Sequence, residues 1–255
     1  MAIRAAGSAM ALKVGALLPI AARGQLVEQY NPIRANCCLA GAAQSLAEQL
    51  QDWNQLGRYY ADNERLKALP PEPKRVVFLG DSITDIWKLD QYFPGKPYVN
   101  RGIGGQTTAQ MLVRVYPDVI DLKPVAVVIL AGTNDISHNT GPETLTMVQE
   151  NLQAIVELAQ VHGIKVVLCT LLPVSDYTVR KQTPGRPPAH ILMVNAWLRE
   201  YAAKVHAVLA DYYPALVDDK GMLREGDADD GLHPNAKGYE LLAPVAQAAI
   251  AKALQ

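Results

Sequence analysis

Short runs of apolar, often β-branched residues alternate with amphipathic stretches along residues 75–254, and this alternation constrains the fold more than any other feature of the chain. The continuously apolar runs, such as 125–130 and 166–168, are typical of parallel strands that are covered on both faces. Strand and helix in alternation predict a doubly wound parallel sheet of the α/β class. The expected strands are 75–79, 98–100, 125–131, 165–171 and 207–212, and the expected helices are 107–122, 143–162, 188–204 and 235–254.

The residues before this alternation predict a helical extension. Five apolar residues within 39–69 recur at spacings of three and four, which predicts that they share the packing face of one helix. They are Leu46, Leu50, Trp53, Leu56 and Tyr60. Prolines at 70, 71 and 73 predict the end of that helix and a stiff connector. We therefore expect an N-terminal arm or signal-like segment at 1–24, a helical extension with its connector at 25–73, and the main domain at 74–255.

The first 24 residues have some features of a secretory signal, because Arg4 precedes an apolar stretch at 14–22. Lys13 and the interrupting Pro19 fit that pattern poorly, and a mobile or surface-packed arm is the alternative. The protein would be secreted or periplasmic with a signal, and cytoplasmic without one. No other apolar run is long enough to cross a bilayer, so we expect no integral membrane segment in the mature chain.

Charge and cysteine content exclude several classes of protein. Lysine and arginine number 24 against 25 acidic residues, so nothing indicates a nucleic-acid or anionic-membrane surface. Three cysteines cannot form a fully paired disulfide framework. Cys37 and Cys38 are adjacent, whereas Cys169 lies in an apolar run and is interpreted as a core residue.

Ligands of doubly wound sheets bind at the carboxyl ends of the strands, so the strand-to-helix junctions are the places to search. The first junction contains Gly80, Asp81 and Ser82. A serine at the start of a helix lies near backbone N–H groups that can face a developing oxyanion. By itself the pattern is also ordinary helix-capping chemistry.

The second and third junctions add backbone and side-chain donors. Residues 100–108 contain three glycines that let the backbone approach a ligand, although a simple tight turn explains them too. Thr107 stands where a dinucleotide-binding loop would need its third glycine, which argues against that site. After the third strand, Asn134 can present its side-chain N–H₂ to the space around Ser82, or it can cap the turn.

The loop before the last helix supplies a base. Asp230 and His233 are three residues apart, so the carboxylate can bind the His Nδ1–H and leave Nε2 free to accept a proton. Asp227 and Asp229 lie in the same loop and are interpreted as solvated charges, with Asp229 a conceivable substitute partner for His233. The other histidines lack ligand-like spacing, so we expect neither a metal nor a cofactor.

Together and in this order, the segments 80–82, 102–105, 132–135 and 230–233 resemble the four motif blocks of the SGNH/GDSL hydrolases. The resemblance covers about residue 74 to the C-terminus and implies a single flavodoxin-like three-layer α/β/α domain with a mostly parallel five-stranded sheet. It is closest to the branch of lysophospholipase-like esterases and platelet-activating-factor acetylhydrolase subunits, because of the Asn-x-Gly-Ile-Gly-Gly-x-Thr-Thr stretch at 100–108. Ile83, where the family often has leucine, is a mild departure.

The resemblance implies Ser82 as nucleophile, His233 as general base and Asp230 as its orienting carboxylate. It also implies an oxyanion hole formed by the Ser82 and Gly105 backbone N–H groups and the Asn134 side chain. The expected activity is hydrolysis of a small-molecule carboxylic ester with a short acyl chain through an acyl-enzyme. Carbohydrate acetylesterase, thioesterase and a non-catalytic binding protein on the same fold are the alternatives.

The loop 173–188 is expected to help shape the acyl pocket. It contains Arg180, Lys181 and Arg186, which could meet an anionic leaving group. We interpret them as basic residues of a solvated loop.

Overall fold

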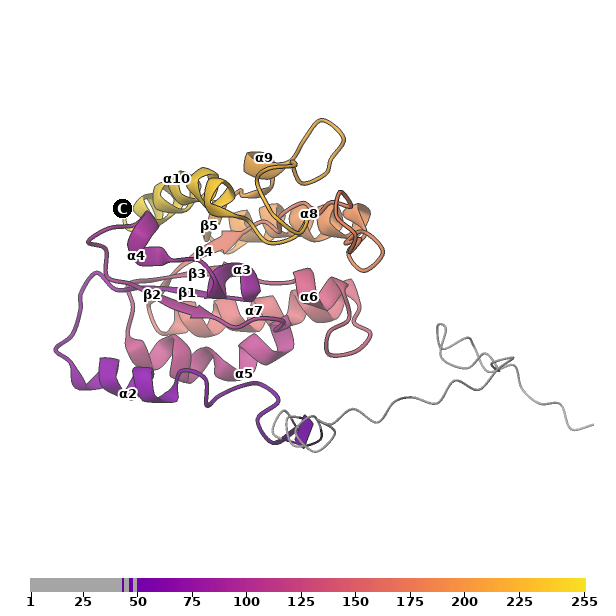
Figure 1. The fold of residues 1–255 in the computed structure, drawn as a ribbon. Helices are drawn as coiled ribbons and strands as arrows, with labels where there is room; N and C mark the ends of the chain where they lie inside the picture. Colours follow the sequence, from indigo (N-terminus) through magenta and orange to yellow (C-terminus); the bar gives the residue numbers. More distant parts are fainter. Residues whose placement is uncertain (1–42, 44–45, 48–49) are drawn as a thin grey trace, which may run out of the picture. The chain divides into compact units, whose positions relative to one another are not determined.

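A parallel sheet of five strands lies at the centre of the structure, with the strand order β2-β1-β3-β4-β5 (Figure 1). This computed structural model describes residues 43, 46, 47 and 50–255, and Leu46–Gln255 form one compact unit. The strands are Val76–Gly80 (β1), Tyr98–Gly102 (β2), Ala126–Leu130 (β3), Lys165–Cys169 (β4) and Val208–Ala210 (β5). Every neighbouring pair is parallel. The order is that of flavodoxin-like doubly wound sheets, which confirms the predicted fold.

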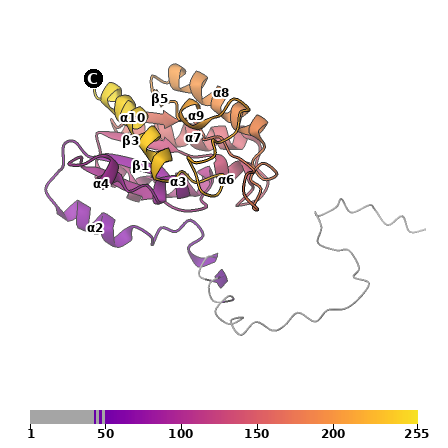
Figure 2. The ribbon, with the colours of Figure 1, turned by 45° about the horizontal axis from the view of Figure 1, so that its top comes forward.

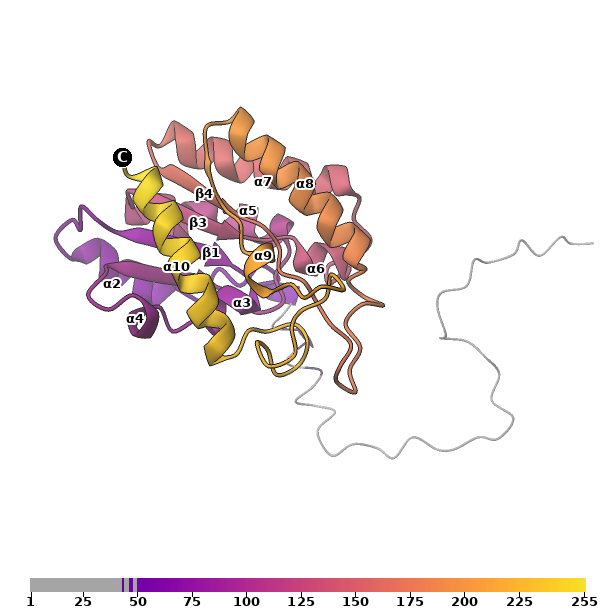
Figure 3. The ribbon, with the colours of Figure 1, turned by 90° about the horizontal axis from the view of Figure 1, so that it is seen from above.

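Helices cover both faces of this sheet and complete three layers. Helices α5 and α7 lie on one face, whereas α10 lies on the other with α4 beside it (Figures 1 and 3). Helix α2 packs outside α5, on the side away from α10 (Figure 2). The helical elements are α2 (Tyr60–Ala68), α3 (Ser82–Asp85), α4 (Leu89–Tyr92), α5 (Thr108–Asp118), η1 (Ile120–Leu122), α6 (Thr133–Ile136), α7 (Leu145–Val161), α8 (Pro188–Lys204), α9 (Tyr213–Leu216) and α10 (Ala236–Ala253).

Burial follows from the two-sided covering of the sheet. Every residue of β1 and β3 is buried, as their continuously apolar sequences predict. On the α10 face, the Trp87 ring stacks on the Tyr239 ring with centroids 5.0 Å apart, and the Phe78 ring meets Trp87 edge-on. The Tyr239 hydroxyl donates to the Ile83 carbonyl over 2.6 Å. These contacts anchor α10 to α3, the helix that begins at Ser82.

The predicted helix within 39–69 is wrong as a single helix. The chain turns at 52–58, where the Asp52 carboxylate accepts the backbone N–H groups of Leu56 at 2.8 Å and Gly57 at 2.9 Å. A side chain that captures backbone donors in this way competes with the helix for them. A new helix, α2, begins at Tyr60. The expected packing face is exposed, with Leu50 81% and Tyr60 66% accessible.

Helix α2 ends at Ala68, just before the prolines that were expected to end the helix. The predicted helix at 107–122 is divided into α5 and the 3-10 helix η1. Pro117 lies inside α5, and the division comes after it at Val119, which has φ of −126° and ψ of −65°. Cys169 is buried in β4, as predicted, whereas Cys37, Cys38 and the proposed boundary at residue 24 lie outside the described residues. None of the helices in the described part of the chain is both long and apolar enough to cross a membrane.

Candidate active site

The sheet topology brings the four sequence motifs together. Ser82 follows β1, Gly105 follows β2 and Asn134 follows β3, so all three lie at the carboxyl ends of adjacent strands. The loop that precedes α10 adds Asp230 and His233. These five residues line one cavity of about 480 Å³. It lies where strand order reverses, which is the usual ligand site of this fold.

A chain of hydrogen bonds joins three of the predicted site residues. His233 Nε2 lies 2.9 Å from Ser82 Oγ, and His233 Nδ1 lies 2.6 Å from Asp230 Oδ2. The same order of groups, hydroxyl to imidazole to carboxylate, activates a serine in Ser-His-Asp triads. The geometry therefore allows the imidazole to take the serine proton while the carboxylate holds the required tautomer.

Local structure explains the position of Ser82. Asp81 caps α3 by accepting the Ile83 N–H at 2.9 Å, so the serine occupies the first position of the helix. Gly80 is required because a Cβ there would lie 2.1 Å from the Thr84 hydroxyl. Burial raises the pKa of Asp81 to about 6, against the opposing effects of the Ile83 N–H and of the charges on His233 and Arg186.

The Asp230 carboxylate is held by the loop that it belongs to. Its Oδ1 accepts the backbone N–H groups of Leu232 at 3.0 Å and His233 at 2.8 Å. Partial burial opposes ionisation, but the bonds from His233 and Leu232 outweigh it and lower the pKa of Asp230. Gly231 has φ of +78°, and a Cβ there would lie 2.4 Å from the Ser175 carbonyl oxygen. The loop thus needs this glycine to pack against Ser175.

The Asn134 amide has a defined orientation. Its Nδ2 donates to the Gln106 carbonyl at 3.0 Å, and its Oδ1 accepts from Arg186 Nη2 at 3.0 Å. If the amide were flipped, its N–H₂ would face the Arg186 donor and its oxygen would face the Gln106 carbonyl. Only the observed orientation therefore satisfies both partners. Because the amide nitrogen has two hydrogens, one N–H remains for a ligand in the cavity. The Asn134 side chain does not cap its own turn, the alternative that the sequence left open, and instead bonds Gln106 and Arg186 in other segments.

The glycine loop is fastened from several directions. Ile103 N–H donates to the Gly80 carbonyl at 3.0 Å, and Gly104 N–H donates to Asp85 Oδ2 at 3.1 Å. The Tyr59 hydroxyl also bonds the Gly102 carbonyl. Gly105 itself has φ of +80°, a left-handed conformation that favours glycine. The loop can therefore present the Gly105 backbone at a constant position beside Ser82.

Two residues that we expected to be solvated are buried. Asp227 is fully buried and pairs with Arg224 at 2.7 Å and Lys237 at 2.8 Å, because a buried carboxylate needs compensating charge. Arg186 is 8% exposed and bonds Asn134, so its interpretation as a solvated loop residue is wrong. Asp229 is exposed and accepts from Asn235 instead of His233.

Sequence reasoning missed Tyr59 and Asp85, which support the glycine loop, and it missed the contact between Arg186 and Asn134. The periodic pattern selected Tyr60 instead of Tyr59, and Asp85 had no motif of its own. For Arg186 the only signal was its place in a basic loop next to the expected site. Contacts between distant segments have no local pattern that would reveal them.

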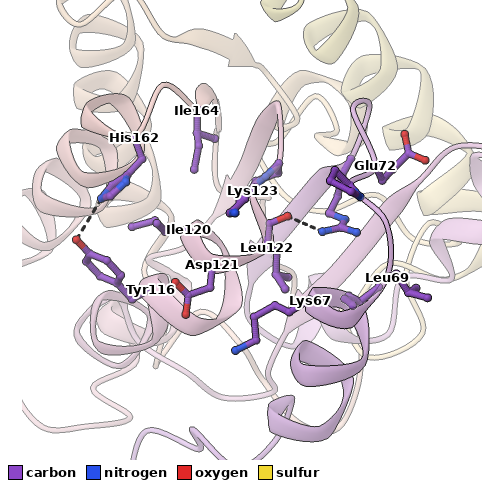
Figure 4. Close-up of a pocket in the computed structure, with 14 residues that line it drawn as sticks. Lys67, Leu69, Glu72, Tyr116, Ile120, Asp121, Leu122, Lys123, His162 and Ile164 are labelled. Carbon is purple, nitrogen blue, oxygen red and sulfur yellow. Dashed lines mark hydrogen bonds between the residues drawn. The ribbon is translucent and has the colours of Figure 1, made fainter.

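A larger hollow of about 800 Å³ lies at the opposite edge of the sheet, where residues that precede β1, β3 and β4 line it (Figure 4). Its polar groups bond one another: the Tyr116 hydroxyl lies 3.1 Å from His162 Nε2, and the Arg75 guanidinium donates to the Leu122 carbonyl (Figure 4). The described residues that line it include neither serine nor cysteine. We therefore place the candidate site at the cavity around Ser82. Across the described residues, no group of three or more His, Cys, Asp or Glu side chains is arranged to hold a metal ion.

Comparison with known proteins agrees with this arrangement. The GDSL-like Lipase/Acylhydrolase family matches residues 78–241. A structure assigned as an acylhydrolase from Bacteroides fragilis NCTC 9343 is 39% identical, with a TM-score of 0.73 over 80% of this chain and 99% of that chain. A GDSL-like lipase from Bacteroides thetaiotaomicron VPI-5482 is 35% identical, with a TM-score of 0.72 over 79% of this chain and 100% of that chain.

The uncharacterized lipoprotein YqeF of Bacillus subtilis (strain 168) is 40% identical over 81 residues, or 31% of this chain. The match spans 33% of that protein's length. The family match covers most of the chain, and it includes the strands and junctions that position Ser82, Gly105 and Asn134. As the order of its four motifs predicted, the chain belongs to the GDSL-like lipase/acylhydrolase family of hydrolases.

Proposed function

We propose that this hydrolase is a serine carboxylesterase that acts through an acyl-enzyme, with Ser82 as nucleophile, His233 as general base and Asp230 as its orienting carboxylate. The observation that carries the proposal is the unbroken hydrogen-bond chain from Asp230 through His233 to Ser82. Each contact lies within the distance at which a base and its nucleophile cooperate.

In the first half of the reaction, Ser82 Oγ attacks the ester carbonyl while His233 Nε2 takes its proton. The resulting imidazolium is stabilised by the Asp230 carboxylate, whose lowered pKa keeps it ionised at neutral pH. His233 then protonates the alcohol oxygen, the C–O bond breaks and Ser82 is left acylated. In the second half, His233 activates a water that attacks the acyl carbon, and the proton returns to Ser82 as the acid leaves.

Three donors would stabilise the negative charge on the tetrahedral intermediates. They are the backbone N–H groups of Ser82 and Gly105 and the second N–H of the Asn134 amide. Within the described structure, the first two groups have no hydrogen-bond acceptor, as expected of donors reserved for a ligand. Fixed donors of this kind stabilise the transition state because they need little reorganisation when charge develops.

The cavity wall favours a short acyl chain. Leu232 is the only aliphatic side chain among the described residues that line the cavity; Ser137, Asn139 and Gln182 add polar groups. A long acyl chain gains affinity by burying methylene groups, at about 0.8 kcal/mol each, and this wall offers little apolar surface for that purpose. The glycine stretch at 100–108 supports placement in the platelet-activating-factor acetylhydrolase-like branch, in agreement with small acyl groups.

A substrate panel tests this proposal. We expect 4-nitrophenyl acetate to be hydrolysed faster than esters with longer acyl chains, and faster than acetylated sugars and acyl thioesters measured in parallel. Ser82→Ala and His233→Ala should each lower kcat at least about a thousandfold, because the triad acts as a unit. The urea midpoint of Ser82→Ala should barely change, since within the described residues the Ser82 side chain bonds only His233.

Folded Ser82→Ala protein with near-wild-type activity would contradict the mechanism. A clear preference for acetylated sugars or for thioesters would keep the mechanism and reassign the substrate. Binding of an ester without turnover, in protein that retains its fold, would instead support the non-catalytic alternative.

A further inference from the structure

The wall of the active-site cavity is rich in positive charge. Arg180, Lys181 and Arg186 all line it, whereas Asp230 is the only carboxylate among the described residues of the wall. Both oxygens of Asp230 are already engaged by its own loop and by His233. A substrate entering this cavity therefore meets three cations, none of which forms an ion pair with a carboxylate of the described residues.

Lack of an ion pair distinguishes Arg180 and Arg186 from most arginines in the described part of the chain. The arginines in the described residues that pair with an aspartate are Arg58, Arg65, Arg101, Arg114, Arg199 and Arg224. The described arginines without such a pair are Arg75, Arg180 and Arg186, and the last two line the cavity. Two of the three unpaired arginines in the described part of the chain therefore line the candidate site.

Arg186 is the most unusual of the three, because it is buried and all of its partners are neutral. Its guanidinium donates to Thr133 Oγ1 at 3.2 Å, Gln182 Oε1 at 3.4 Å and Asn134 Oδ1 at 3.0 Å. Buried charges in proteins are normally paired with an opposite charge. Burial lowers the pKa of Arg186 and the charge of Arg180 adds to this effect, whereas the charges of Asp81 and Asp230 oppose it. A cation cluster of this kind inside a cleft attracts anions strongly.

Two of the cations, Arg180 and Lys181, lie in a loop that contacts the loop carrying His233. Arg180 and Lys181 stand between Thr178 and Gln182 in the sequence, and both of those neighbours donate to the Asp230 carbonyl, at 3.4 Å and 3.1 Å. The basic loop is therefore fastened to the loop that carries His233. His233 is the group that would protonate the leaving oxygen, so Arg180 and Lys181 would face the alcohol half of an ester, whereas Arg186 lies beside Asn134.

We propose that the natural substrate is an ester whose alcohol half carries an anionic oxygen group, a carboxylate or a phosphate, which Arg180, Lys181 and Arg186 recognise. Guanidinium groups bind both kinds of anion through paired N–H donors. This inference rests on the proposed esterase function and names the substrate class of the same site.

Matched acetate esters test the inference. The neutral substrate is 4-nitrophenyl acetate, the second is 3-carboxy-4-nitrophenyl acetate, and the third is an acetate whose phenol carries a phosphate monoester. Each kcat/KM is divided by the rate of hydroxide-catalysed hydrolysis of the same ester, which removes differences in leaving-group reactivity. We expect a ratio of anionic to neutral ester of about tenfold or more at low salt, falling at about 0.5 M salt as screening increases. The two anionic arms show whether carboxylate or phosphate is preferred.

The double variant Arg180→Gln/Lys181→Gln should lower the ratio at least about fivefold, mainly through KM for the anionic esters. The matched control Lys165→Gln/Lys252→Gln removes the same charge from exposed positions outside the cavity, and it should leave the ratio unchanged. A wild-type ratio of one or less, or a ratio equal in the two double variants, would overturn the inference while leaving the esterase function standing. Wild-type protein that hydrolyses none of the esters, or hydrolysis that survives Ser82→Ala, would instead contradict the proposed function and this inference together.

Discussion

Replacing Asp230 by asparagine would separate the catalytic contribution of the carboxylate from its structural one. The new side chain can keep its carbonyl oxygen at the Oδ1 position, where it accepts the N–H groups of Leu232 and His233. Its N–H₂ then occupies the Oδ2 position, 2.6 Å from His233 Nδ1. An amide that donates to Nδ1 forces the ring proton onto Nε2, which faces Ser82 Oγ and can no longer accept a proton.

The size of the effect follows from these contacts. The flipped amide, which would restore the active tautomer, loses two hydrogen bonds to backbone donors and is disfavoured by about 2–3 kcal/mol. Only a few per cent of the molecules would then be competent, because every 1.4 kcal/mol corresponds to about tenfold. Loss of the negative charge beside the imidazolium should remove about another ten- to a hundredfold, limited by water because the Asp230 side chain is 47% exposed. We expect kcat to fall by about a thousandfold to ten-thousandfold.

The assay is the kcat for 4-nitrophenyl acetate, with the urea midpoint measured on the same samples. Since both backbone bonds survive, the stability of Asp230→Asn should change by less than about 1 kcal/mol. Asp229→Asn is the matched control, because Asp229 is exposed and bonds Asn235 outside the triad. A folded Asp230→Asn variant with a kcat within tenfold of wild type, or an equal loss in the control, would refute the reasoning.

Two further substitutions test the environment of the site. Asn134→Ala should lower kcat by about a hundred- to a thousandfold with a smaller change in KM, because one oxyanion donor is lost. The same change should lower the free energy of unfolding by about 2–4 kcal/mol, because Arg186 and the Gln106 carbonyl each lose a hydrogen-bond partner. Steady-state kinetics measure the first effect and urea unfolding the second. A variant that keeps its kcat would exclude Asn134 from the oxyanion hole. Asp81→Asn should remove a pH dependence of stability. The pKa of Asp81 is raised from 3.8 to about 6, so the protonated form is favoured in the folded state, and its stabilisation is present below about pH 4 and lost as the pH rises through 6. Between pH 4 and pH 7 the free energy of unfolding of wild type, measured with urea, should fall by up to about 3 kcal/mol more than that of Asp81→Asn. Parallel plots of unfolding free energy against pH for the two proteins would contradict this.

The sequence alone determined the fold class and the positions of the site motifs. Continuously apolar segments at 126–130 and 166–169 are satisfied by burial on both faces, which indicates parallel strands between helices. Ligands of such sheets lie at the strand ends, and Ser82, Asn134 and His233 could be named because each stands at a junction with chemistry of its own. Their order along the chain was sufficient to indicate the family.

Only the tertiary structure decided which groups of distant segments meet. Arg186 belongs to a loop that looks solvated in sequence, and it becomes a buried cation only because the loop folds back onto Asn134. Asp227 likewise becomes buried between Arg224 and Lys237. Periodicity also misplaced the N-terminal helix, since the Asp52 carboxylate captures backbone donors that the helix would need. Periodicity and motifs are local, whereas burial and charge pairing depend on which surfaces the fold brings together, and no spacing along the chain encodes that.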